Sequence, residues 1–304
     1  MDLDVGEAEA WVRSCLPIAG PLALVQTEPW ASVFRAPVDG GVVWFKACAP
    51  RQAFEVPLTA GLAERWPGTV SEVLAHDVDR RWLLMADAGE PLRELGNPPE
   101  RWLEILPSYA MLQIGEAEGA EHHVARGVPD LRLGRLPALY DELLRPELPL
   151  DPDERSALEA FGPRFEELCD ALHGVGIGPT VQHDDLHMNN VYLRNNNLRV
   201  LDWGDASIAH PFFSLFETFR FLTELNLLGP NDPWFARVRD AYLEPWESDR
   251  AAFDLALTVG GFAHAIAWLH QREALTAADR AGSDIGFAQI LRLALRGATG
   301  SPEV

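Results

Sequence analysis

Three oxygen-bearing side chains gather around one short stretch of the chain. Residues 182–190 read Gln-His-Asp-Asp-Leu-His-Met-Asn-Asn, and Asp202 follows in a Leu-Asp-Trp-Gly run. Magnesium prefers oxygen ligands, and Asn190 and Asp202 would supply them from opposite ends of one hairpin. Asp185, on the loop before the hairpin, could accept the proton of a hydroxyl and orient its oxygen for attack. These residue types in this order favour phosphoryl transfer, which depends on positioning and charge neutralisation.

A lysine at the end of an apolar strand would supply the positive charge. Lys46 closes the run Val-Val-Trp-Phe-Lys. Its ammonium is a point charge suited to the α- and β-phosphate oxygens, although a snorkelling surface lysine is the alternative. Kinases pair such a lysine with a glutamate on the next helix. Glu55 is the first choice here, and Glu64, two turns further on, is the second.

The combined pattern resembles the protein-kinase catalytic loop, which is His-x-Asp, four residues and Asn, then a hairpin and Asp-x-Gly. More closely, residues 183–193 and 201–205 resemble the aminoglycoside phosphotransferase and choline kinase-like group, whose loop typically reads His-Gly-Asp-Leu-His-Pro-Gly-Asn-Val. The runs at 44–46 and 82–85 extend the likeness along most of the chain.

The resemblance implies an α+β, protein-kinase-like fold with two lobes. Residues 1–87 would form an N-terminal nucleotide-binding lobe, an antiparallel sheet with one helix. Residues 88–304 would form a mostly helical C-terminal lobe that holds the catalytic loop and the substrate.

The same resemblance implies ATP as phosphate donor, Mg²⁺ as cofactor and a small hydroxylated acceptor. Adenine would lie against the connector near Met85, Ala86 and Ala88. His183 would brace the backbone, whereas His187 would either lie near the transferred phosphate or only order the loop. Aminoglycoside, amino sugar and amino alcohol acceptors all remain open, as do ATP against GTP and the oligomeric state.

The chain departs from the group's pattern at several positions. Asp184, Met188 and Asn189 stand where Gly, Pro and Gly are usual, and we expect Asp184 to face solvent. The later Gly-Asp-Pro-x-x-Asp-Leu pattern appears as Ala-His-Pro-Phe-Phe-Ser-Leu, so Ser214 would cap or bridge in place of an aspartate. The stretch 27–32 lacks the glycines of a phosphate-binding loop.

Periodicity and turn residues place these motifs on a definite order of elements. In the N-terminal part we expect a helix at 7–15, strands at 22–27, 32–37 and 42–47, a helix at 52–66, and strands at 73–76 and 82–85. After a connector at 86–91 we expect helices at 100–118, 137–144, 153–173, 211–228, 232–243, 251–270 and 285–295. Between them lie strands at 181–182, 191–193 and 198–201, with three asparagines at 195–197 as a turn.

Charge and cysteine content narrow the class of protein. The formal charge is −21, and such a surface repels phosphate backbones and anionic lipids, so we expect neither nucleic acid nor membrane as partner. Three cysteines lie far apart, which indicates reduced thiols in a cytoplasmic protein. The acidic N-terminus does not look like a signal peptide. The apolar stretch 255–269 is shorter than a membrane span and is expected to be a buried helix.

The negative charge has two interpretations. It can be a solvated acidic surface that keeps the protein soluble, or part of it can line a cleft that attracts a cationic acceptor. On the second interpretation, Glu217, Glu224 and Asp254 are the candidate carboxylates near Asp185.

Two other functions compete with phosphoryl transfer. A metal-dependent hydrolase would use His183, Asp185 and His187, which would share one face if they lay on a strand. That interpretation leaves Lys46 and the Asp202 motif unexplained. A catalytically inactive, nucleotide-binding pseudokinase is the second, although every charged catalytic part is present.

Overall fold

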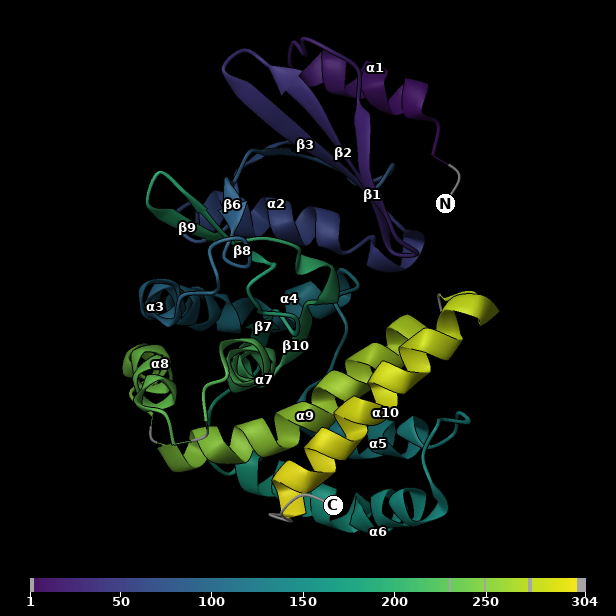
Figure 1. The fold of residues 1–304 in the computed structure, drawn as a ribbon, viewed down its shortest axis with the longest axis vertical. Helices are drawn as coiled ribbons and strands as arrows, with labels where there is room; N and C mark the ends of the chain where they lie inside the picture. The colour runs from purple at the N-terminus through teal and green to yellow at the C-terminus, as the bar shows by residue number, and fades with distance from the viewer. Residues whose placement is uncertain (1–2, 230, 249, 273–274, 300–304) are drawn as a thin grey trace.

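An antiparallel sheet of five strands forms the N-terminal part of the chain (Figure 1). The computed structural model describes residues 3–229, 231–248, 250–272 and 275–299. The strands lie in the order β1-β2-β3-β5-β4. Their bounds are Ala23–Thr27 (β1), Ala31–Val38 (β2), Gly41–Cys48 (β3), Val73–Asp77 (β4) and Trp82–Ala86 (β5).

The alternation of side chains along β3 decides what each face of the sheet does. Phe45 and Ala47 pack with Val12 of helix α1 (Val5–Cys15) in an apolar cluster on one face. Cys48 packs with Val56 of helix α2 (Glu55–Arg65) on the other. Successive residues of a strand point to opposite faces. Lys46 therefore lies on the face that carries α2.

The C-terminal part is mostly helical and surrounds the main hydrophobic core. Its helices are α3 (Pro99–Glu116), α4 (Ala120–Ala125), α5 (Leu136–Leu143), α6 (Pro152–His173), α7 (Leu215–Asn226), α8 (Pro233–Leu243), α9 (Arg250–Arg272) and α10 (Ala277–Thr299). Its short strands are β6 (Glu90–Pro91), β7 (Thr180–Gln182), β8 (Val191–Arg194), β9 (Asn197–Val200) and β10 (Ser207–Ala209). β7 pairs with β10, and β8 pairs with both β6 and β9.

Helix α9 is the central helix of this lobe. It packs against α5, α6, α7 and α10, and Phe262 on its inner side meets the rings of Tyr140, Phe161 and Phe165. By length and composition alone α9 could cross a membrane, yet 61% of its most apolar window is buried inside the molecule. The apolar stretch 255–269 thus lies in a mostly buried helix, and the helix predicted at 251–270 matches α9 to within two residues at each end.

Most predicted elements occur within a few residues of their expected bounds. The prediction of one helix at 211–228 is wrong, because a 3-10 turn at Pro211–Ser214 precedes α7. The predicted helix at 285–295 covers only the central part of α10. Helix α4 and strands β6 and β10 were not predicted; each has six residues or fewer, too short for a periodic signal.

Candidate active site

The loop between β7 and β8 holds three of the predicted site residues. Asp184 takes a left-handed backbone conformation, with φ of 61°, so the chain reverses there and strand alternation is lost. His183, Asp185 and His187 therefore do not share a strand face. Among the described residues, no group of three or more histidine, cysteine or acidic side chains could hold a metal ion. The arrangement required by the hydrolase interpretation is absent from this part of the chain.

Lys46 joins the sheet to the C-terminal lobe. Its ammonium lies 2.6 Å from Glu55 Oε1 and 2.7 Å from Asp202 Oδ1. The side chains of Lys46 and Glu55 are only 6% and 2% exposed. Burial alone would lower the pKa of Lys46, but Asp202 and Glu55 outweigh it and raise that pKa well above its ordinary value. The lysine is therefore charged, and Glu55 is its helix partner; Glu64 is not.

The Asp202 turn is shaped to fit this ion pair. Asp202 is left-handed, with φ of 62°, and the chain turns under α2 at Gly204. A Cβ at Gly204 would lie 2.9 Å from Glu55 Oε2, so glycine is the residue that leaves room for the glutamate. Desolvation by the surrounding protein raises the pKa of Asp202 although its side chain is 47% exposed, but the Lys46 ammonium outweighs this effect and holds the pKa below its usual value.

Both carboxylate oxygens of Asp185 have a neighbour on the catalytic loop. His187 Nε2 lies 3.0 Å from its Oδ1, and Asn190 Nδ2 donates to its Oδ2 at 3.0 Å. The other ring nitrogen of His187 accepts from the amide of Asn189 at 3.1 Å. An imidazole that accepts at Nδ1 carries its proton on Nε2. His187 therefore turns its N–H side toward Asp185 and stands beside the carboxylate.

His183 braces the end of the hairpin. Its Nε2 lies 2.8 Å from the carbonyl oxygen of Leu201, one residue before Asp202. The ring is fully buried against Trp203, and burial lowers the pKa of His183 despite the nearby carbonyl. A neutral imidazole that donates to a carbonyl has a structural task. The position of His183 fits the bracing role that the resemblance implied.

Ser214 bridges the catalytic loop to the helical lobe, as expected from its place in the altered motif. Its Oγ lies 2.7 Å from the hydroxyl of Tyr109 and 3.1 Å from Gln182 Oε1. The backbone amide of His183 donates to the same Tyr109 hydroxyl at 3.0 Å. From α7, Thr218 donates to the carbonyl of Leu186 at 2.6 Å. The loop is thus held at its start by Tyr109 of α3 and in its middle by Thr218 of α7.

Asn190 and Asp202 fit a magnesium ion by the chemistry of their free oxygens. The amide nitrogen of Asn190 is occupied by Asp185, and its Oδ1 accepts no hydrogen bond from any residue that the structure describes. Lys46 takes one oxygen of Asp202, whose side chain is 47% exposed, and leaves the other toward solvent. Two hard oxygen donors beside a charged lysine are a suitable donor set for this cation.

The connector after β5 is anchored firmly. Met85 and Ala86 pair with β3, Ala88 is buried, and Gly89, with φ of 91°, lets the backbone approach Leu193 closely. A cavity of about 700 Å³ is lined by Ala86 and Ala88 together with parts of α2, β4 and the β8–β9 turn. Its lining does not include Lys46, Asp185 or Asp202.

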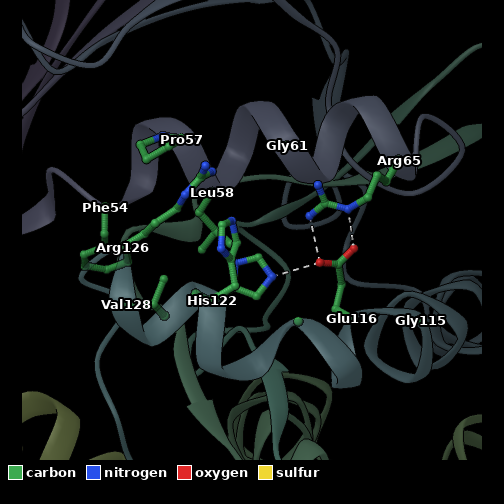
Figure 2. Close-up of a pocket in the computed structure, with 12 residues that line it drawn as sticks. Phe54, Pro57, Leu58, Gly61, Arg65, Gly115, Glu116, His122, Arg126 and Val128 are labelled. Atoms are coloured by element: carbon green, nitrogen blue, oxygen red, sulfur yellow. Dashed lines mark hydrogen bonds and ion pairs between the residues drawn. The ribbon is translucent and has the colours of Figure 1, made fainter.

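A second cavity lies between α2 and the α3–α4 corner (Figure 2). The cavity measures about 260 Å³, and Glu116 is one of its lining residues. The Glu116 carboxylate accepts hydrogen bonds from Nε and Nη2 of Arg65, each at 2.7 Å. Buried His123 also contacts Glu116, at 2.9 Å, whereas His122 is exposed. Adjacent residues on a helix point in different directions, so the sequence alone predicts a solvated pair of histidines, and this prediction is wrong for His123. Burial opposes ionisation of Glu116, yet His123, Arg65 and Trp66 lower its pKa to about 2.

Asp184 does not face solvent as expected. It is buried, and its Oδ2 lies 3.2 Å from Nδ1 of His264 in α9. Glu217 is also buried, 3.4 Å from the other ring nitrogen of His264 and bonded to Arg220. Glu217 is therefore not available as an acceptor ligand. The signals for this cluster were Asp184 at a glycine position and a lone histidine in an apolar helix.

The other proposed acceptor carboxylates are also engaged. Glu224 pairs with Arg220 at 3.0 Å, and Asp254 pairs with Arg250 at 3.1 Å at the start of α9. A carboxylate that sequence reasoning missed lies closer to the site. Burial, and then the charges of Asp185 and Asp202, raise the pKa of Asp205 well above its ordinary value, and Gln271 donates to it.

Comparison with solved structures defines the class of fold. The APH(2")-IIia protein, solved with GDP and kanamycin, superposes with a TM-score of 0.66 at 15% identity, over 98% of this chain and 99% of that one. A choline kinase from Cryptosporidium parvum Iowa II gives 0.65 at 13% identity, over 98% and 95%. A choline/ethanolamine kinase family protein from Mesorhizobium loti gives 0.61 at 16%, over 97% and 99%.

These matches confirm the protein-kinase-like, two-lobed α+β fold, with a sheet in the N-terminal lobe and helices in the other. They include both kinds of small-molecule phosphotransferase that the catalytic loop resembles. No protein-family profile matches the chain, and no curated protein matches it either.

Proposed function

We propose that this protein transfers the γ-phosphoryl group of ATP to a hydroxyl of a small molecule, with Mg²⁺ as cofactor. The observation that carries the proposal is the position of Lys46. Its charged ammonium contacts Glu55 of the N-terminal lobe and Asp202 of the C-terminal lobe. This is the lysine, helix glutamate and Asp-x-Gly aspartate set on which kinase chemistry depends. The phosphotransferase folds that match the chain support the same class of reaction.

The side chains around Asp185 determine how the acceptor would be activated. Asn190 donates to one carboxylate oxygen and His187 lies 3.0 Å from the other, and an ionised carboxylate oxygen can accept more than one hydrogen bond. The acceptor hydroxyl would donate to Asp185, which fixes the direction of its oxygen and takes its proton as the new P–O bond forms. The β–γ bridging oxygen leaves with the electrons of the broken bond, and Lys46 is placed to bind the phosphates.

Asn190 Oδ1 and the free oxygen of Asp202 would hold the magnesium ion. When bound, the ion neutralises phosphate charge. Phosphate oxygens would compete with Asp202 for the Lys46 ammonium. Asp202 would then give up its contact with Lys46 and bind the magnesium ion. Met85, Ala86 and Ala88 would carry the adenine along the connector.

The acceptor class follows from the charge around Asp185. Asp202, whose pKa is lowered, belongs to the same site, and the chain as a whole carries −21. We therefore favour an amino-bearing acceptor, such as an aminoglycoside, amino sugar or amino alcohol, over a neutral sugar. The kanamycin complex of a matching fold supports the first of these.

The experiment that tests the proposal measures ATP consumption with magnesium over a panel of aminoglycosides, amino sugars, amino alcohols and neutral polyols. We expect one amino-bearing class to raise consumption well above the rate with water alone. Tight nucleotide binding without turnover on any acceptor would favour the pseudokinase and overturn the proposal.

The metal assignment has its own variant. Asp202→Ala should abolish the strengthening of ATP binding by magnesium in calorimetry, because the chief oxygen ligand is gone. Asp77→Asn is the matched control, since Asp77 is a carboxylate of the outer strand β4 that pairs with Arg80. If magnesium strengthened ATP binding equally in Asp202→Ala and the control, the metal would lie elsewhere.

A further inference from the structure

A buried row of charged side chains lies directly behind the catalytic loop. Asp184 comes from the loop, His264 from α9 and Glu217 from α7, and their side chains are only 3%, 5% and 2% exposed. Each belongs to a different element, so the row joins the loop to two helices of the C-terminal lobe. Buried ionisable groups are costly unless they are paired, so this cluster requires an explanation.

The geometry of His264 determines its charge state. Its Nδ1 lies 3.2 Å from Asp184 Oδ2, and its Nε2 lies 3.4 Å from Glu217 Oε1. A neutral imidazole has one N–H and would leave one carboxylate without a donor, whereas an imidazolium has two. Burial lowers the pKa of His264, but the charges of Asp184 and Glu217, with a further contribution from Asp185, raise it to about 9.

The two carboxylates have further partners that fix the row in place. Gln182 donates to the other oxygen of Asp184 at 2.9 Å and accepts from the Asp184 amide at 2.7 Å. Glu217 binds Arg220, which also binds Glu224. The remaining groups packed on the imidazole from α7 and α9 are the uncharged rings of Phe216 and Trp268.

The backbone of Asp184 connects the row to the site. Asp184 has a positive φ of 61°, a conformation that glycine adopts freely and that other residues adopt when local hydrogen bonds hold them. The next residue is Asp185, whose amide donates to the carbonyl of His183 at 2.7 Å to close the turn. Any relaxation of Asp184 toward negative φ would swing the Asp185 carboxylate away from His187 and Asn190.

We propose that His264 is a positioning residue for the phosphoryl transfer proposed above: by binding the Asp184 carboxylate it holds the left-handed turn that aims Asp185. This inference rests on the proposed function. It gives a reason for Asp184 at a position where the resembling group has glycine, because an ion pair here does the work that conformational freedom does there.

The pairing makes the loop sensitive to alkaline pH. The pKa of His264 is raised from 6.5 to about 9, so its contribution to stability is complete below about pH 6.5 and is lost as pH rises through about 9. We expect kcat to fall over the same alkaline range, while the Michaelis constant for ATP changes little.

The test compares one substitution in two backgrounds. The probe is the slow hydrolysis of magnesium-ATP, in which water takes the place of the acceptor hydroxyl. His264→Gln should lower kcat about tenfold or more in the natural background. In Asp184→Gly the turn no longer needs an ion pair, so adding His264→Gln should change kcat less than about twofold. Equal losses in the two backgrounds would overturn the proposal.

A pH profile separates positioning from simple packing. The natural protein should lose kcat on the alkaline side near pH 9, and Asp184→Gly should lack this loss. His123→Gln is the matched control, because His123 is also buried and also paired with a glutamate, but at the α3–α4 corner. It should lower the melting temperature and leave the alkaline limb unmoved. An alkaline limb that persists unchanged in Asp184→Gly would contradict the proposal.

The charge of His264 can be measured without any activity. In protein labelled with ¹³C-histidine, the signal that His264→Gln removes should be that of an imidazolium at pH 7.5 and should titrate near pH 9. A neutral His264 at pH 7.5 would overturn the positioning role even in an active enzyme. A charged His264 in a protein that binds ATP and turns over nothing would overturn the proposed function and, with it, the catalytic role of the row.

Discussion

Asp185 accepts a hydrogen bond from Asn190 and lies 3.0 Å from His187, and this arrangement leads to a prediction for its amide variant. Asp185→Asn keeps the shape of the side chain but replaces one oxygen by an N–H group, which would face the donor His187 or Asn190. We expect kcat to fall by about 10²-fold or more, since a base and an orienting contact are lost together, while ATP affinity stays nearly unchanged. Steady-state kinetics and calorimetry on the same preparation check this.

Asn190→Asp is the companion variant, because it changes the charge beside Asp185 and leaves the Asp185 carboxylate itself in place. It would keep an oxygen ligand for magnesium while removing the donor to Asp185, so it should lower kcat and leave magnesium-dependent ATP binding in place. Near-normal turnover in Asp185→Asn would remove Asp185 from the mechanism.

At the residue scale, the contact between Lys46 and Glu55 could be predicted from the sequence, whereas the partners of Asp184 could not. Lys46, Glu55 and Asp202 meet as expected, because a strand, a helix start and a hairpin end each fix one residue. The contacts of Asp184 were predicted wrongly. Pairing with a histidine 80 positions later depends on how α9 packs, and no local pattern around Asp184 carries that information.

At the scale of elements, α2 is held in place from two sides. Glu55 at its start binds Lys46, and Arg65 at its end binds Glu116 of α3. The second contact ties the helix that carries the lysine's partner to the C-terminal lobe. We therefore expect the α2–α3 contact to contribute to stability and to the alignment of the site.

Glu116→Gln should lower the free energy of unfolding at pH 7 by roughly 1–3 kcal/mol, because it leaves a charged arginine beside a neutral amide. The pKa of Glu116 is lowered to about 2 from 4.5. Its contribution is thus present above about pH 4.5 and lost as pH falls toward 2. Urea unfolding at pH 7 and thermal unfolding at lower pH should show the difference between the variant and the natural protein shrink with acid.

Elements with a clear period or a clear turn could be predicted, and the others could not. The asparagine turn of the β8–β9 hairpin is where it was expected, with Asn195 and Asn196 both left-handed. The early residues of α10, 277–284, are polar and small and give no apolar stripe. The helix begins there with a local cap, because the Asp279 amide donates to Thr276 Oγ1 at 3.3 Å. An apolar period does not contain that signal, so the start of the helix was missed.

At the scale of the whole molecule, the net charge of −21 leads to a prediction about the acceptor. Glu217 is used inside the protein, so we expect the attraction to come from Asp185 and from Asp202, whose pKa is lowered. The raised pKa of Asp205 makes this carboxyl a poor source of negative charge. A cationic acceptor should gain a few kT from this field, and its Michaelis constant should rise with ionic strength. A neutral acceptor should show little change.

The measurement is a salt series with ATP saturating and magnesium fixed. Potassium chloride from low to physiological concentration spans the range in which screening changes most. A cationic acceptor whose Michaelis constant ignores salt would contradict the acidic-cleft idea and leave the phosphotransferase proposal intact. The predicted boundary between the two lobes, between residues 87 and 88, stays a prediction. Strand β6, which begins just after it, pairs with β8, the first strand of the hairpin that follows the catalytic loop.

The labelling rate of the Cys48 thiol can report how often the surroundings of the Lys46 ion pair open. Its thiol is covered and donates to Glu55 Oε2 at 3.3 Å, and burial with the nearby Glu55 charge raises its pKa well above the ordinary value. A thiol reagent can therefore reach it only when the sheet and α2 separate, whereas exposed Cys15 reacts at once and serves as an internal standard. The ratio of the Cys48 labelling rate to the Cys15 labelling rate therefore reports how often the N-terminal sheet and α2 separate around Lys46. The measurement needs no engineered cysteine, because both thiols belong to the natural chain.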